Sequence, residues 1–227
     1  MVVFFVTPTG PSGPIALNGE SPIVTKPRET KTMKKAGIRF FLFITIALLS
    51  ACGGLRYAQV NPEAKDFHPR SIAVLPVDVR TSYEATGQAD DILTRTLEKS
   101  GKFSKVVSPG EIRKEMEKDA GLSRNISDYV AKFRAVNFSD PSLTLSLGEH
   151  FDVEALLLAT VDFWTYTVEG EDKVAKVGFA VDLIDTATGR VAWKAAHHET
   201  KTYWLIKPDL PDVAESVAQI IVTDMPH

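Results

Sequence analysis

The chain has 227 residues, of which 44% are hydrophobic and 24% are charged, and its formal net charge at pH 7 is −3. This composition is typical of a globular protein and excludes a disordered or fibrous chain. An acidic balance disfavours nonspecific binding to nucleic acid, so we expect no nucleic-acid partner. Cys52 is the single cysteine, which excludes an internal disulfide.

The first 32 residues differ in composition from the rest of the chain. They are rich in Pro, Gly, Thr and Ser and carry no helix or strand period. Met33 directly precedes Lys34 and Lys35, as the initiator methionine of a secretory signal does. We therefore expect residues 1–32 to be an over-extended gene start with no fold of their own.

Residues 33–51 have the three-part layout of a signal peptide. A basic segment leads into about ten apolar residues, fewer than the roughly 20 that span a bilayer. The segment ends in Leu49, Ser50, Ala51 and Cys52, which resembles the lipobox of bacterial lipoproteins. That resemblance implies a covalent lipid on Cys52 as the membrane anchor. Because Gly53 follows, it also implies delivery to the outer membrane, with the domain in the periplasm.

Residues 1–51 contain six Lys or Arg and two Asp or Glu, so the net charge of residues 52–227 alone is −7, against −3 for the whole chain. Residues 52–70 are polar and contain Pro62 and Pro69, which predicts a tether. Residues 71–227 then form one periplasmic domain. Its first element is a buried strand at 71–77, which Pro76 should end because proline cannot donate to a ladder.

Two helices and a short strand follow this first strand. Residues 88–100 predict a helix that Gly101 caps, and residues 105–107 predict a short strand. Ser108, Pro109 and Glu111 predict a helix start with a capping box, and Gly121 should end this helix.

The second half of the domain changes from helices to strands. Residues 126–136 predict a helix, and Asp140 and Pro141 start another. Three strands at 153–168, 173–184 and 190–203 predict an antiparallel meander, and residues 209–223 predict a final helix. The predicted fold class is α/β, with a mixed sheet, a C-terminal antiparallel meander and helices packed on the sheet.

The turn between the last two predicted strands carries the most specific pattern of the domain. Asp185 can bind backbone amides, Thr188 follows it, Gly189 permits a positive φ, and Trp193 packs on the sheet. These four residues predict a structural turn and carry no catalytic chemistry.

The order of motifs over residues 69–200 is similar to that of a group of bacterial periplasmic lipoproteins. A strand at 70–77 opens the domain, an apolar segment follows at 147–161, and the D-x-x-T-G hairpin comes last. The group includes the curli secretion subunit CsgG and the penicillin-binding-protein activator LpoB, with the N-terminal domain of TolB as a more distant likeness. The resemblance implies an envelope lipoprotein with this α/β fold.

Two members of that group suggest alternative functions. A CsgG-like secretion channel would need long amphipathic hairpins that join into a membrane barrel, whereas residues 111–151 predict helices. A penicillin-binding-protein activator would need a long tether, whereas residues 53–70 span at most about 60 Å when extended.

Candidate catalytic and metal-binding residues are sparse. His197 and His198 are neighbours in a predicted strand, so they point to opposite faces and cannot share an ion. His197 and Glu199 could share a face, but two ligands do not make a metal site. An enzyme would need a pocket that gathers distant polar residues, such as Asp162 or Asp182 with His197. We expect no metal, no cofactor besides the covalent lipid, no catalytic residue and no enzymatic activity.

Aromatic residues are dense in the predicted meander. Trp164 and Tyr166 should share one sheet face and Phe163 the other. Tyr203 and Trp204, followed by two further apolar residues, predict an exposed surface for a protein partner. The sequence therefore predicts a non-catalytic accessory or scaffold of an envelope assembly or transport complex, with envelope proteins as partners.

Overall fold

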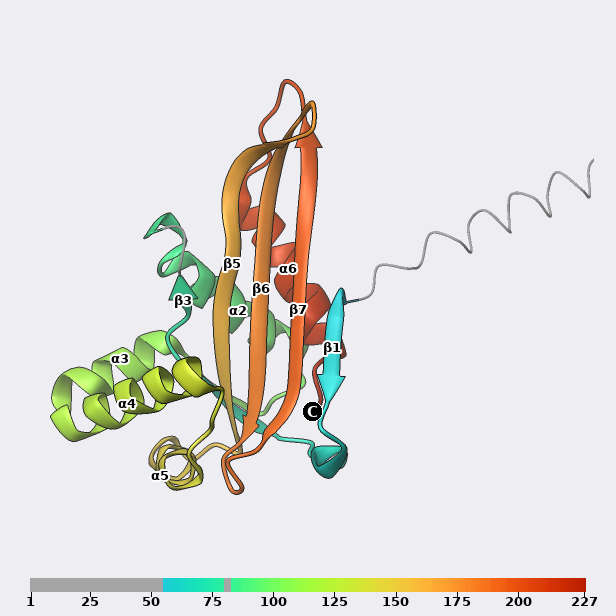
Figure 1. The fold of residues 1–227 in the computed structure, drawn as a ribbon. Coiled ribbons are helices and arrows are strands. Elements are labelled where there is room, and N and C mark those ends of the chain that lie inside the picture. The colour runs from blue at the N-terminus through green and yellow to red at the C-terminus, as the bar shows by residue number, and fades with distance from the viewer. Residues whose placement is uncertain (1–54, 80–82) are drawn as a thin grey trace, which may run out of the picture. The chain divides into compact units, whose positions relative to one another are not determined.

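The computed structural model describes residues 55–79 and 83–227 (Figure 1). Within them, seven strands form one mixed sheet in the order β1-β7-β6-β5-β2-β4, with β3 beside β5. The strands are β1 (Tyr57–Val60), β2 (Ser71–Val74), β3 (Asp78–Val79), β4 (Lys105–Val107), β5 (Ala155–Glu169), β6 (Asp172–Asp185) and β7 (Val191–Tyr203). The helices are α2 (Gln88–Ser100), α3 (Pro109–Lys118), α4 (Ala120–Val136), α5 (Pro141–Phe151) and α6 (Leu210–Asp224), with short 3-10 turns η1 (Pro62–Ala64) and η2 (Tyr83–Ala85).

The pairing of the strands confirms the predicted fold class. β2 pairs in parallel with β4 and β5, whereas β5, β6 and β7 form the predicted antiparallel meander. The connection from β2 to the parallel strand β4 includes α2, and the connection from β4 to β5 includes α3, α4 and α5. Such helical crossovers are what parallel pairing requires.

Helices cover the two faces of the sheet unequally (Figure 1). One apolar core lies between the sheet and helices α2 and α6, and includes Leu93, Leu157, Phe179 and Val217. A second, smaller core lies on the other face under α3, α4 and α5, and includes Leu156, Ile126 and Leu147. We call the part of the sheet between these two cores, together with the helices that cover it, the covered half.

The three strands of the meander continue beyond the covered half as a ribbon, made of residues 163–169, 172–178 and 198–203. One face of the ribbon is buried against the α6 side through Trp164, Ala175 and Val177. On the other face Phe163 is exposed and lies over Gly178, where a Cβ atom would come 2.9 Å from the Phe163 ring. Trp164 and Phe163 thus occupy opposite faces, as the sequence predicted.

The helix starts follow the predicted local chemistry. The Ser108 side chain accepts a hydrogen bond from the Glu111 amide while the Glu111 carboxylate accepts one from the Ser108 amide, so the capping box is confirmed. Asp140 caps α5 by accepting hydrogen bonds from two amides of its first turn. Gly101 ends α2 in the left-handed conformation with φ 65°.

Several boundaries differ from the prediction. The first strand, β2, ends at Val74, ahead of the predicted residue 77. α3 ends at Lys118 rather than at Gly121, because Asp119 caps the next helix by accepting from the Gly121 and Leu122 amides. α4 consequently begins at Ala120, ahead of the predicted residue 126. Residues 57–64, which were expected in a tether, form β1 and η1, and β1 pairs with β7 from Tyr57 to Val60.

Candidate interaction surface

Three consecutive large apolar residues stand exposed at the end of the ribbon. Trp204, Leu205 and Ile206 lie in the connection from β7 to α6, with exposed fractions of 90%, 91% and 86%. In Figure 1 this connection forms a loop beside the turn between β5 and β6. We call these three residues the tip patch. Exposed large apolar side chains that adjoin one another are typical of interaction sites.

Contacts at both ends of this loop hold it in place. Pro208 accepts a hydrogen bond of 2.8 Å from the Tyr166 hydroxyl through its backbone carbonyl. Lys207 Nζ lies 3.3 Å from the centre of the Tyr166 ring, a close cation–π contact. Tyr203 packs edge-on against Tyr166, with ring centres 6.1 Å apart. The tip patch is therefore presented by an anchored loop, not by a chain end.

Tyr203 and Trp204 have different positions, although the sequence placed both on one partner surface. Tyr203 is half-buried against Tyr166, whereas Trp204 is almost fully exposed. Leu205 and Ile206, which the sequence placed in the same exposed stretch, are as exposed as Trp204. Val168, near the end of β5, is also exposed. The sequence did not predict its exposure, since strand periodicity does not show where a sheet loses its cover.

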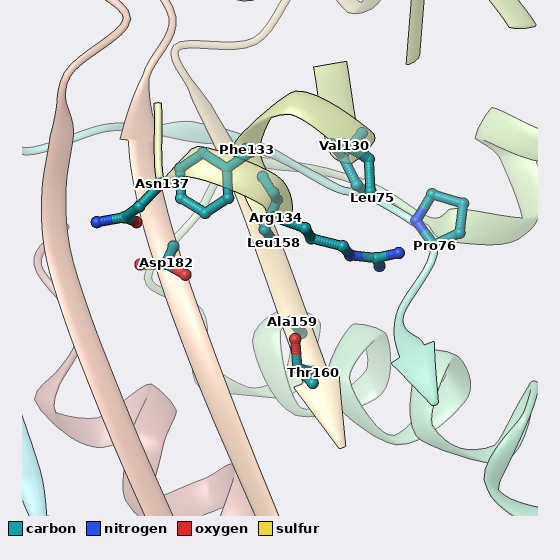
Figure 2. A pocket seen from close by; sticks show the side chains of 10 residues that line it. All are labelled: Leu75, Pro76, Val130, Phe133, Arg134, Asn137, Leu158, Ala159, Thr160 and Asp182. Carbon is teal, nitrogen blue, oxygen red and sulfur yellow. The ribbon is translucent and has the colours of Figure 1, made fainter. Parts of the chain in front are cut away.

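A small pocket of about 190 Å³ lies between the end of α4 and the sheet (Figure 2). Apolar residues line part of it, and four polar side chains complete the lining: Arg134, Asn137, Thr160 and Asp182. Arg134 is paired with Asp78 at 3.3 Å, and Asp182 is paired with Lys194 at 2.7 Å. Lys194 also donates to Asn137 Oδ1, so Arg134, Asn137 and Asp182 are already engaged within the chain.

The polar residues proposed for an enzyme do not come together. Asp182 lies beside Leu158 and Lys194 on the α4 side of the sheet. His197 lies on the α6 side, is 8% exposed, and its Nδ1 has no hydrogen-bond partner. Burial lowers the pKa of His197, so it is neutral at physiological pH. Asp162 lies beyond both, at the bulge in β5.

Strand β7 also carries His198 and Glu199, which the sequence raised with His197 as possible metal ligands. Glu199 accepts a hydrogen bond of 2.7 Å from Ser216 of α6, which draws its carboxylate to the helix. His198 packs edge-on against Phe163 on the opposite face from His197. Across residues 55–79 and 83–227, no three His, Cys, Asp or Glu side chains are close enough together to hold a metal ion.

The turn between β6 and β7 is held by its own side chains. Asp185 accepts hydrogen bonds from the Ala187 amide and from the Thr188 hydroxyl, at 2.9 and 2.6 Å. Gly189 has φ 69°, and a Cβ atom there would lie 2.6 Å from Pro141 Cα. Trp193 is 2% exposed in the core beneath α6. These contacts lock α5 against the turn.

The predicted anchor residues, Leu49, Ser50, Ala51 and Cys52, lie outside the described residues. The helices that the structure does describe are each too short or too polar to cross a membrane.

Neither the family models nor the curated protein sequences contain a match to this chain. Solved structures do resemble its fold. A PelC dodecamer from Paraburkholderia phytofirmans is 22% identical, with a TM-score of 0.47 over 74% of this chain and 93% of that one. Lipoprotein GNA1162 from Neisseria meningitidis is 18% identical, with a TM-score of 0.47 over 69% and 100%. The C-terminal domain of LpoB from Salmonella enterica is 15% identical, with a TM-score of 0.39 over 60% and 87%.

These similarities concern the fold alone and do not assign the chain to a family. LpoB, which the sequence resemblance named, is among the structures, whereas the likeness to CsgG and TolB stays a prediction.

Proposed function

We propose that this protein is a lipid-anchored accessory protein of the bacterial envelope, which acts by binding another protein and catalyses no reaction. The observation that carries the proposal is the tip patch, three large apolar side chains that the fold holds in water. Burying Trp204, Leu205 and Ile206 against a partner would contribute roughly 1.5–3 kcal/mol for each aliphatic or aromatic side chain. A surface of this kind binds a protein more readily than it performs chemistry.

The expected anchor places limits on the partner. Cys52 is five residues before the first strand, so the chain between its lipid and Tyr57 spans at most about 18 Å. An acylated Cys52 would therefore keep the domain close to the membrane that holds it. This supports a partner in or beside the same membrane, the outer membrane by the nature of residue 53. The LpoB resemblance suggests an inner-membrane penicillin-binding protein as the partner. Such a protein would have to extend across the periplasm to contact a domain held close to the outer membrane.

The secretion-channel alternative has less support than the accessory role. A channel would need the hairpins of the meander to face lipid. In this chain β6 and β7 pack against α6, which buries Val177, Phe179 and Val181 in the domain core.

The test is in-cell chemical crosslinking of the full-length protein, followed by purification and identification of the attached envelope proteins. The variant replaces Trp204, Leu205 and Ile206 with Ser. The matched control is Leu145→Ser, which changes an exposed leucine of α5 in the covered half. We expect the recovered partner to fall at least tenfold in the triple variant and to stay unchanged in Leu145→Ser. Equal recovery from wild type and triple variant would contradict the proposal.

A further inference from the structure

One edge of the ribbon has no strand beside it in the part of the chain that the structure describes. β3 pairs with β5 only as far as Val161. A bulge follows, and from Phe163 to Glu169 the strand β5 pairs with β6 alone. Figure 1 shows this half of β5 at the margin of the sheet. The outer backbone groups of these residues therefore form a row that another strand can join.

The register identifies which residues present those groups. The Leu157 carbonyl accepts a hydrogen bond from the Leu75 amide, which directly follows β2. Before the bulge, the odd-numbered residues of β5 therefore direct their backbone N–H and C=O groups toward β2 and β3. The extra residue in the bulge reverses this order. Trp164, Tyr166 and Val168 therefore direct their N–H and C=O groups outward. The Thr165 hydroxyl donates to the Tyr166 carbonyl at 3.2 Å, as expected for a carbonyl that β6 does not use.

Beyond the bulge, this edge lacks the proline and lysine residues by which proteins often block strand addition. Residues 163–168 contain two Thr, a Val and three aromatic residues, but no Pro and no Lys. The outer edge of β7 is less accessible to another strand. Arg56 Nε donates to the His198 carbonyl there, and β7 also carries Lys201, a residue type that disfavours strand addition. β5 is thus the edge that favours a further strand.

Exposed apolar side chains accompany the edge. Phe163 and Val168 lie on it, and Tyr83, which is 96% exposed, faces it from η2. A hollow of about 770 Å³ runs alongside, lined by Tyr83, Glu84, Leu210 and residues 162–166. The hollow leaves space next to the strand for an incoming chain.

We propose that two copies of this chain pair along this edge, β5 against β5 in antiparallel orientation, with Tyr166 on the twofold axis. In this register every outward-facing residue meets an outward-facing residue of the second copy. Tyr166 lies opposite Tyr166, and Trp164 lies opposite Val168, so each pair exchanges two backbone hydrogen bonds. A shift by two residues either way leaves Trp164 or Val168 without such a counterpart. The sequence of the edge is therefore complementary to itself.

The side chains agree with the same register. On the α6 side, Trp164 of one copy meets Val168 of the other, an aromatic–aliphatic pair of the kind that stabilises sheets. On the open face, Thr165 meets Thr167. No like charges are placed opposite each other.

The one carboxylate of this edge finds a cation in the same arrangement. Glu169 lies opposite Phe163 of the second copy, and Lys176 Nζ is 4.5 Å from the Phe163 ring centre. Lys176 is also 2.8 Å from Glu169 of its own chain. Pairing thus brings each Glu169 toward the Lys176 of both copies. Because the contact is the same on both sides, it closes as a dimer and does not grow into a ring or a fibre.

Cysteine pairing in the full-length protein tests the register. Thr165 and Thr167 would form a non-hydrogen-bonded pair with Cα atoms about 4.5 Å apart, within disulfide range. Thr165 and its own symmetry mate would be diagonal neighbours at about 7–8 Å, beyond that range. We therefore expect a mixture of Thr165→Cys and Thr167→Cys chains to form disulfide-linked dimers under mild oxidation. Thr165→Cys alone and wild type, which retains Cys52, should form none.

A second test blocks the edge without disturbing the ribbon. Val168→Pro removes an outward N–H but none that pairs with β6, and Val168→Ala keeps it. We expect the native mass of the detergent-extracted protein to be that of a dimer. The dissociation constant should rise at least tenfold in Val168→Pro and clearly less in Val168→Ala. A monomer in wild type, a ring-sized assembly, or crosslinking of Thr165→Cys to itself as readily as to Thr167→Cys would each overturn the proposal.

Discussion

The covered half and the ribbon share the three long strands β5, β6 and β7, yet these strands have different surroundings in the two parts. In the covered half β5 and β6 have α2 and α6 on one face and α3, α4 and α5 on the other. In the ribbon they keep a core on one face only, and the apolar residues that remain are at the edge and the tip. The same continuous strands thus connect the rigid covered half to an exposed surface at the end of the ribbon. We therefore expect substitutions in the covered half to change stability, and substitutions at the end of the ribbon to change the proposed binding.

Trp193, near the start of β7, and Trp204, just after its end, should differ most in their effect on stability. Trp193 is 2% exposed and belongs to the core beneath α6. Trp193→Ala should lower the free energy of unfolding by about 4 kcal/mol, because it leaves a large cavity. Urea denaturation of the variant measures this loss. A loss below about 1 kcal/mol would show that the covered half is less tightly packed than its burial indicates.

The turn at Gly189 should be nearly as sensitive. Gly189→Ala combines a positive φ with a Cβ that would lie 2.6 Å from the backbone of Pro141. Strain and overpacking together should lower the free energy of unfolding by about 3 kcal/mol. Gly170→Ala is the matched control, because Gly170 has φ 65° in the ribbon turn and open space around its Cβ position. Thermal unfolding should therefore separate the two variants; equal melting temperatures would contradict the close packing at Pro141.

Tyr129 gives a smaller effect that depends on pH. Burial raises the pKa of Tyr129 to about 12, and its hydroxyl contacts Ser139 Oγ at 2.9 Å. The unfolded chain ionises first, near pH 10, so stability is complete below that pH and declines as the pH rises toward 12. Tyr129→Phe should lower the free energy of unfolding by about 1 kcal/mol at neutral pH and lessen the alkaline decline. Urea denaturation across this range checks both effects, and an unchanged alkaline slope would contradict the second.

The smallest effect on stability is expected at the tip patch. Trp204→Ser should change the free energy of unfolding by no more than about 0.5 kcal/mol, because Trp204 has little contact with the domain. The same denaturation experiment measures it. A loss as large as that of Trp193→Ala would mean that the tip patch packs against the domain in solution and is not a contact surface.

Much of the covered half could be predicted from the sequence, because its signals are local. Ser108 with Glu111, Asp140 with Pro141, and Gly101 each fix a helix end by bonds within a few residues. Alternation of apolar residues identified the three strands of the meander to within a few residues of β5, β6 and β7.

The elements that the sequence missed are determined by distant partners. β1 contains only exposed residues and exists because Tyr57 to Val60 can pair with the outer edge of β7. β3 is two residues long and exists only beside β5. For the candidate site, apolar residues before Lys207 and Pro208 indicated the tip patch. The open edge of β5 could not be predicted, because its exposure depends on where β3 ends.

The claim that the end of the ribbon is the working surface is tested most directly by photo-crosslinking in living cells. A photoreactive amino acid replaces Leu205 in the tip patch or, in a separate strain, Leu145 in the covered half; both leucines are exposed. We predict an adduct with an envelope protein other than a second copy of this chain from position 205, and none from position 145. Adducts from position 145 alone, or from neither position, would contradict the account.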